Sequence, residues 1–164
     1  KYDIDTDTWT TNLPDAIYPR DHAVGAFING EVCVASGRDT SQEMFGIAFV
    51  PETECYNIAS GTWSTKPNIP TPRAGSAGGL TCDGKLVVIG GEGGGGTFRE
   101  VEVFDGSSWT SLPSIVRKRH GTGLAVNCDC NEWYIAGGAG KQGARPLLTR
   151  DERYRPEDST CAYA

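Results

Sequence analysis

The chain has 164 residues, of which 38% are hydrophobic, and a formal net charge of -6. This composition is that of a folded domain and excludes a disordered chain or a coiled coil. The negative charge argues against a nucleic-acid partner, because phosphate binding needs a clustered basic excess. No stretch approaches the ~18 to 20 apolar residues needed to cross a bilayer.

Glycine is unusually common and is spread along the whole chain. There are 22 glycines, about twice the usual share of ~7%, which indicates many turns. Short apolar or alternating runs rich in β-branched residues, such as 85–89 and 100–104, lie between them. The sequence therefore predicts strands and turns throughout.

In chain order, strands are expected at 2–4, 22–28, 31–36, 53–58, 74–81, 85–90, 99–105, 120–126, 132–137 and 149–155. Three further strands carry Trp9, Trp63 and Trp109, which recur at spacings of 54 and 46 residues. They define an internal repeat, which decides the fold.

Four landmarks keep one order in this repeat. An aromatic residue comes first, then tryptophan, then an arginine that follows proline in two of the three copies, then a pair of small residues after an apolar strand. The aromatic residues are Tyr2, Tyr56, Phe104 and Tyr154; the arginines are Arg20, Arg73 and Arg119; and the small pairs are Ser36 with Gly37, Gly90 with Gly91, and Gly137 with Gly138.

This order resembles the kelch repeat over essentially the whole chain. The resemblance implies an all-β, kelch-type β-propeller of the galactose oxidase-like central domain type, built from four-stranded antiparallel blades. We expect about three to three and a half blades, with approximate boundaries at 1–19, 20–72, 73–116 and 117–164. Large residues recur once per blade because only stacked neighbours bury both faces of a blade. The structural repeat residues are Trp9, Trp63, Trp109, Gly90, Gly91, Gly137 and Gly138.

About half of a six- or seven-bladed ring is expected, and an open half-ring exposes apolar faces and strand edges. We therefore expect a segment of a longer chain, or several chains that complete a ring or filament. The glycine run at 90–96 is interpreted as scaffold and not as a phosphate loop, since no helix follows it.

The strands of each blade are expected to run antiparallel. The segment before the first strand of a blade and the loop after its second strand should therefore lie on the same rim. The rim residues are Arg20, His22, Arg38, Asp39, Phe45, Arg73, Glu92, Phe98, Arg99, Arg117, Arg119, His120, Lys141 and Arg145. In kelch propellers this rim often binds peptides or glycans, so the resemblance implies a binding surface that includes Arg20, His22, Arg38, Phe45, Arg73, Arg99, Arg119, His120 and Arg145. The arginine fork suits carboxylates.

A structural interpretation stays open for several of these residues. Arg20, Arg73 and Arg119 occupy a position that often braces neighbouring loops in kelch propellers. His22 and His120 are two candidate metal ligands, but the repeat places no third ligand near them, and no metal is predicted. The long insertion 37–54 is a candidate functional loop. Gln42, Phe45 and Phe49 are its first mutational targets, although the phenylalanines also suit packing onto the blade.

Six cysteines without redox or metal spacing favour disulfides and an oxidising compartment, although buried free thiols are an alternative. Cys82 is expected to pair with Cys128 or Cys130 across two blades, and Cys33 with Cys55 within one. The sixth cysteine is Cys161.

The preferred hypothesis is an extracellular or secretory-pathway module without enzyme activity or cofactor. Its partner is a protein, a glycan, or further blades or copies in a structural assembly.

One alternative is the propeller of a secreted copper-radical oxidase, which needs two histidines, tyrosines, and a cysteine cross-linked to a tyrosine. This chain offers His22 and His120 but no convincing tyrosine and cysteine pair on the same rim. The other alternative is a cytosolic substrate-adaptor kelch domain.

Overall fold

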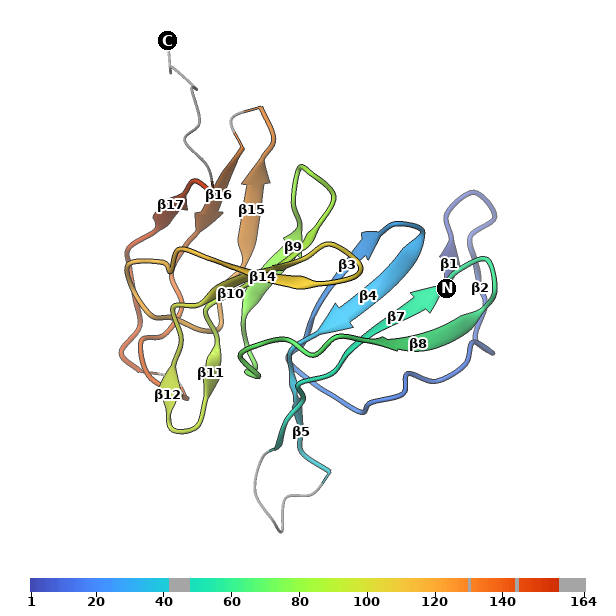
Figure 1. Ribbon diagram of the computed structural model, residues 1–164, viewed down its shortest axis with the longest axis horizontal. Helices are drawn as coiled ribbons and strands as arrows, with labels where there is room; N and C mark the ends of the chain where they lie inside the picture. The colour runs from blue at the N-terminus through green and yellow to red at the C-terminus, as the bar shows by residue number, and fades with distance from the viewer. Residues whose placement is uncertain (42–47, 130, 144, 157–164) are drawn as a thin grey trace.

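A computed structural model describes residues 1–41, 48–129, 131–143 and 145–156. Every regular element in these residues is a strand, and the strands form twisted antiparallel sheets arranged side by side (Figure 1). No helix in the described residues is long and apolar enough to span a membrane.

The three main sheets are propeller blades whose strands follow one another in space as they do in sequence. The first blade contains β3 (Val24–Ile28), β4 (Glu31–Ala35), β7 (Thr53–Asn57) and β8 (Thr62–Lys66). The second contains β9 (Ala77–Leu80), β10 (Leu86–Ile89), β13 (Val101–Phe104) and β14 (Trp109–Leu112). The third contains β15 (Leu124–Asn127), β16 (Glu132–Ile135) and β17 (Glu152–Tyr154).

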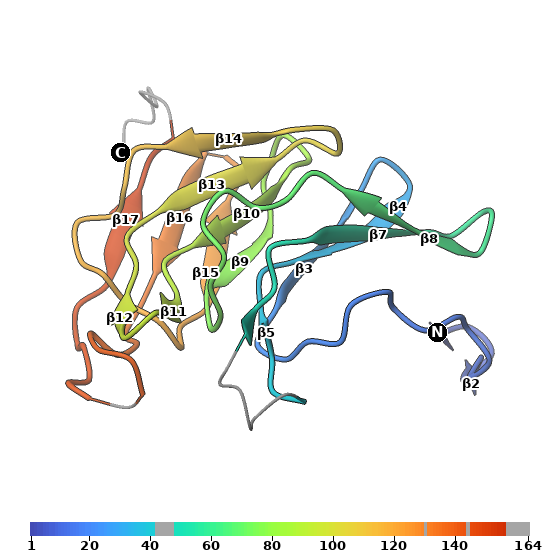
Figure 2. The same cartoon turned by 60° about the horizontal axis from the view of Figure 1, so that its bottom comes forward.

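The N-terminal pair, β1 (Tyr2–Asp3) and β2 (Thr8–Trp9), forms a separate two-stranded sheet. It lies apart from the three blades (Figure 2), and its residues are exposed. Its strands correspond to the last two strands of a blade, as the repeat predicts. The other strands also match their expected positions, although the first strand of each blade begins two to four residues later because the residues after each arginine form a loop on the rim.

Two small hairpins on the rim were not predicted. β5 (Arg38–Asp39) pairs with β6 (Ala48–Phe49), and β11 (Glu92–Gly93) pairs with β12 (Gly96–Thr97). The second hairpin turns through Gly94 and Gly95, whose φ angles of 56° and 88° suit a two-residue type I′ turn. The glycine run therefore makes a tight hairpin and leads into a strand, as expected of scaffold.

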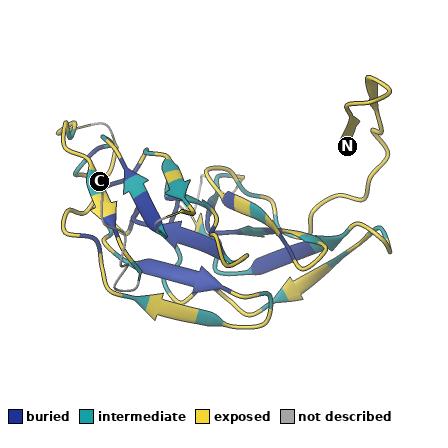
Figure 3. Cartoon of the chain, turned by 90° about the horizontal axis from the view of Figure 1, so that it is seen from above, coloured by how far each residue is buried: buried dark blue, intermediate teal, exposed yellow. Residues whose placement is uncertain are grey.

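The core lies between the blades, in two clusters. Leu86 and Val88 of β10 belong to the cluster shared with the first blade, whereas Val87 and Ile89 belong to the cluster shared with the third. All four side chains are fully buried, which explains why this strand is continuously apolar and does not alternate. Buried strands stack against each other in Figure 3.

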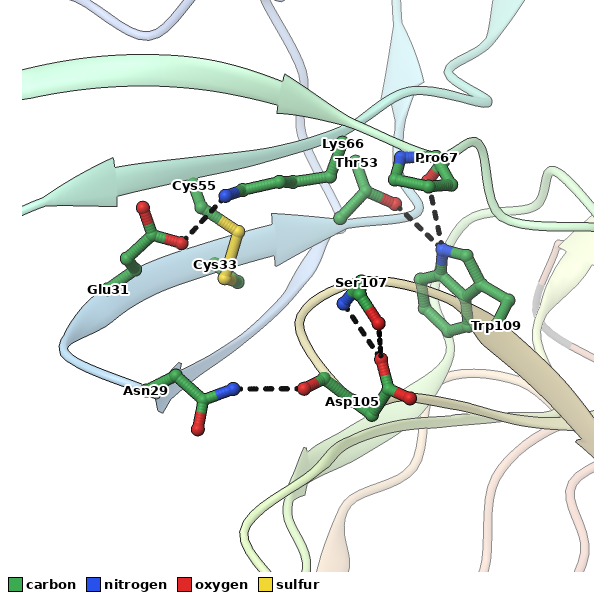
Figure 4. Close-up of a disulfide and its surroundings, with 10 residues drawn as sticks. All are labelled: Asn29, Glu31, Cys33, Thr53, Cys55, Lys66, Pro67, Asp105, Ser107 and Trp109. Atoms are coloured by element: carbon green, nitrogen blue, oxygen red, sulfur yellow. Dashed lines mark hydrogen bonds and ion pairs between the residues drawn. A yellow bond between two sulfur atoms is a disulfide. The ribbon is translucent and has the colours of Figure 1, made fainter.

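Tryptophans connect neighbouring blades through their indole N–H groups. Trp63 donates to the carbonyl of Pro14 (3.1 Å), and Trp109 donates to the carbonyl of Pro67 (3.0 Å) and to Thr53 Oγ1 (3.1 Å), as Figure 4 shows for Trp109. Each acceptor lies one blade earlier. The repeated tryptophan thus contributes a polar link as well as apolar area.

Two disulfides confirm the expected pairings. Cys33 and Cys55 join β4 to β7 at directly opposite positions (Figure 4). Cys82 and Cys128 join the first turns of the second and third blades across a Cα–Cα distance of 5.3 Å. Between the two partners left open for Cys82, the structure selects Cys128. Cys130 and Cys161 lie outside the described residues.

Candidate functional site

The predicted rim is assembled by backbone pairing between segments far apart in sequence. Asp21 pairs with Arg38, Ala74 with Glu92, and His120 with Ala139, so each blade brings its entry segment against the loop after its second strand. The same arrangement in three blades follows from the repeat. The side chains at equivalent positions differ, and these differences give the rim its chemistry.

The three repeated arginines are structural. The side chains of Arg73 and Arg119 are fully buried and that of Arg20 is 5% exposed. Each is paired with a glutamate on the third strand of its own blade and also donates to backbone carbonyls. The inclusion of these arginines in the binding rim is therefore wrong, because their side chains are buried and their guanidinium groups pair with glutamates and backbone carbonyls.

The partner glutamates were missed by the sequence analysis. Glu54 lies 3.0 Å from Arg20, Glu102 pairs with Arg73, and Glu152 lies 2.5 Å from Arg119. Each stands two residues before the recurring aromatic residue, and that spacing is a signal from which they could have been found. Burial lowers the pKa of Arg73, and the facing carboxylate of Glu102 opposes that shift.

At the inner end of the rim, alternating charged side chains connect the blades. Asp21 Oδ1 accepts from Arg38 Nε at 2.9 Å and lies 2.8 Å from His22 Nδ1. Arg38 lies 3.8 Å from Glu92, whose other oxygen is 3.5 Å from His120 Nε2. We call these five residues the inner rim network. Desolvation raises the pKa of Asp21, but the hydrogen bonds from His22 and Arg38 outweigh it and hold the pKa below its ordinary value.

His22 occupies a backbone position that disfavours side chains. Its φ is 54°, and the equivalent residues of the next two blades are glycines, Gly75 and Gly121, with φ of 62° and 63°. The three positions are joined by backbone hydrogen bonds of 3.0 and 2.8 Å, so they form one inner row. A non-glycine residue in this conformation costs roughly 1 to 2 kcal/mol. The half-exposed imidazole stands there despite that cost.

The remaining predicted rim residues divide into two groups. Phe49 and Phe98 both lie close to Gly93, where an added Cβ would meet each ring at 3.2 Å, so Phe49 packs onto the blade. Arg99, Arg117, Lys141 and Arg145 are exposed further out on the rim. Gln42 and Phe45 lie outside the described residues, so their expected role stays a prediction.

The described residues do not assemble a metal site from the histidines. His120 Nε2 lies 2.9 Å from the carbonyl of Lys141, whereas His22 is paired with Asp21. Glu31, Cys33 and Cys55 form the described cluster of ligand-type atoms, but both sulfurs are bonded to each other and Glu31 pairs with Lys66 at 2.8 Å. This cluster is therefore a disulfide beside an ion pair (Figure 4).

Antiparallel blades of four strands, stacked face to face with their loops gathered on two rims, define the class of β-propellers. The kelch motif family model matches residues 73–115, which span the second blade. The solved structure of YjhT superimposes with a TM-score of 0.72 at 14% identity, covering 96% of this chain and 49% of that chain. The fold is thus that of kelch-type β-propeller blades, and the second blade carries a kelch motif.

Curated relatives of this chain include two galactose oxidase sequences, from Gibberella zeae (strain ATCC MYA-4620 / CBS 123657 / FGSC 9075 / NRRL 31084 / PH-1) and from Gibberella zeae. Each is 32% identical over 89 residues, which amounts to 52% of this chain and 12% of the relative. The chain therefore spans about an eighth of the length of these relatives.

Proposed function

We propose that this propeller segment is an extracellular binding module that recognises a protein or glycan with the inner end of its rim. The proposal rests on the contacts, the exposure and the backbone conformation of His22. Its imidazole contacts Asp21, which also accepts from Arg38. The imidazole is half exposed and occupies a strained position that the next two copies of the repeat fill with glycine. Strain retained on an exposed rim is typical of functional positions.

An oxidising compartment is supported by the two disulfides and by the similarity to galactose oxidase. Both bonds occupy positions where they hold strands or blades together. Disulfides of this kind persist outside the cytosol, which makes a cytosolic substrate adaptor the weaker hypothesis. Peptide mapping of the secreted protein without reduction tests this assignment.

The copper-radical alternative does not fit the described residues. That chemistry requires a cysteine free to be cross-linked to a tyrosine, and all four described cysteines are disulfide-bonded. The two histidines have separate partners, as shown above. We therefore propose a module without enzyme activity or cofactor. Stoichiometric copper in the purified full-length protein would contradict this proposal.

The binding role is tested with His22→Gly in the full-length protein. Glycine fits the backbone of this position, so the variant should fold while losing the imidazole. We expect arrays of immobilised extracellular proteins and glycans to show a ligand that the wild type binds and that His22→Gly binds at least about tenfold more weakly. Asp129→Asn, an exposed change in a turn of the opposite rim, is the control and should bind normally. Equal binding by His22→Gly and the wild type would refute the proposal.

A further inference from the structure

The outer rim of the third blade has a hollow with cationic and aliphatic walls. Arg99, Val116, Arg117, Lys118, Pro146 and Leu148 line a recess of about 580 Å³. An adjoining recess is lined by Lys141, Arg145, Pro146 and Leu147. Pro146 lines both recesses, so they adjoin each other. We call the combined surface the outer hollow.

The cations of the outer hollow have no carboxylate partner among the described residues. Of the 15 lysines and arginines in the chain, eight lie within 4.0 Å of a carboxylate in the described residues and seven do not. Five of these seven line the outer hollow, and they come from three separate segments of the chain. This concentration occurs in a protein with a net charge of -6. Gathering like charges opposes folding unless an opposite charge binds there.

Exposed aliphatic side chains accompany the cations. Val116 is 79% exposed and Leu147 is 73% exposed, which places them among the most exposed large hydrophobic residues of the described chain. Pro146 and Leu148 extend this apolar surface. Glu152 already pairs with Arg119 and accepts the backbone N–H groups of Val116 and Arg117. It is therefore used in holding the wall of the outer hollow.

The cations and the exposed aliphatic side chains together favour one class of anionic partner over the others. A polynucleotide would face the repulsion of the whole acidic chain. An acidic glycan would match the cations, but none of the described residues that line these recesses is aromatic and could serve as a platform for a sugar. A peptide segment with carboxylates and aliphatic side chains matches both kinds of wall, since carboxylates suit the guanidinium fork and aliphatic groups bury Leu147 and Val116.

We propose that the outer hollow binds an acidic, aliphatic peptide segment of a partner protein. The carboxylates pair with Lys141 and Arg145 on one side and with Arg99 and Arg117 on the other, while aliphatic side chains cover Leu147. This surface does not include His22, and the variants that test it leave the His22 imidazole unchanged. Failure of either proposal therefore leaves the other standing.

The probe is a short fluorescent peptide that alternates glutamate with leucine, titrated into the full-length protein with anisotropy as the readout. We expect Arg145→Glu and Lys141→Glu each to weaken binding at least about fivefold. Lys1→Glu makes the same charge change at another unpaired cation, remote from the outer hollow, and should alter binding less than about twofold. Leu147→Ser should weaken binding without changing its salt dependence, because it removes only apolar contact.

Four results would overturn the proposal. The first is equal loss of affinity in Lys1→Glu and Arg145→Glu, which would reduce the effect to net charge. The second is unchanged binding of a peptide with glutamine in place of glutamate. The third is tighter binding by a uronic acid oligosaccharide than by the peptide, which would make the partner a glycan. Concentration-dependent self-association that Arg145→Glu abolishes would also overturn it, in favour of a second copy of the chain.

Discussion

Arg73 shows how a surface-type residue becomes part of the scaffold in this fold. Its guanidinium donates to the carbonyls of Thr71, Val88 and Gly90 and pairs with the carboxylate of Glu102. The entry segment of the blade is thereby tied to its second and third strands. Arg20 and Arg119 make the corresponding contacts in their own blades. The cost of removing both charges from water offsets much of the attraction within such a buried pair. The pair therefore contributes mainly by fixing where the entry segment lies against the strands.

Removing one member of this buried pair should be costly. We expect Glu102→Gln to lower the free energy of unfolding by about 3 kcal/mol, because the buried guanidinium of Arg73 loses its counter-charge. Urea denaturation measures the change. The control is Asp83→Asn, which removes a solvent-accessible ion pair with Lys85 and should cost less than about 1 kcal/mol. Equal effects of the two substitutions would show that Arg73 is not held as described.

Tyr154 predicts how stability depends on alkaline pH. Burial raises the pKa of its phenol from 10.0 to about 12, and the hydroxyl donates to the carbonyl of Pro113. The unfolded chain therefore releases this proton first, so the contribution is complete below pH 10 and is lost as the pH rises toward 12.

Urea unfolding at pH 9 and at pH 11 tests this expectation. Tyr154→Phe should be somewhat less stable at pH 9, since it loses one hydrogen bond, and should lose less further stability between the two values than the wild type. An identical loss in both proteins would assign the alkaline sensitivity to other groups.

At the scale of elements, the blades are fastened to each other in three ways. Apolar side chains alternate between the two faces of β10, tryptophan N–H groups reach the carbonyl of the preceding linker, and Cys82 is bonded to Cys128. Asn29 adds a link on the same rim as this disulfide by donating to the carbonyl of Asp105 (Figure 4). Neighbouring blades are therefore held at both their faces and their turns.

The disulfide between blades should matter for stability. Replacing Cys82 and Cys128 together by serine is expected to lower the free energy of unfolding by about 2 to 4 kcal/mol, because it releases a constraint across 46 residues. Thermal unfolding, compared with the wild type under oxidising and reducing conditions, measures the loss. The reduced wild type should resemble the variant in the unfolding of this part of the chain. A wild type whose stability does not change on reduction would contradict the prediction.

At the scale of the whole molecule, the first blade has an open outer side. The β1–β2 pair stands away from the blades, with Ile4 82% and Trp9 72% exposed, and Phe27 and Val32 of the first blade are also exposed. Propellers normally bury such surface by closing the ring. Further blades or a partner chain packed against this side would bury that surface.

We expect residues 1–164, expressed alone, to associate as concentration increases. The exposed apolar side chains of the N-terminal pair provide the contact. Analytical ultracentrifugation should show less association for the double variant Ile4→Ser and Trp9→Ser than for the wild type. Lys1→Glu and Asp129→Asn serve as surface controls. A wild-type segment that stays monomeric over the same concentration range would contradict this expectation.

The sequence by itself determined the blades. The spacing of Trp9, Trp63 and Trp109 and of the aromatic residues before them predicts the strands within a few residues, because each blade is a local unit of consecutive hairpins. The Cys33 and Cys55 pairing follows from the same local register. These features depend on neighbours in sequence, so their pattern can be interpreted without coordinates.

Only the tertiary structure decided the chemistry of the rim. It buried Arg73 and Arg119 against glutamates, placed His22 beside Asp21 and Arg38, and brought Lys118 and Arg145 to one hollow from separate segments. These contacts depend on how loops from different strands and blades converge. Blade rotation and loop conformation set that convergence, and the one-dimensional repeat does not encode it.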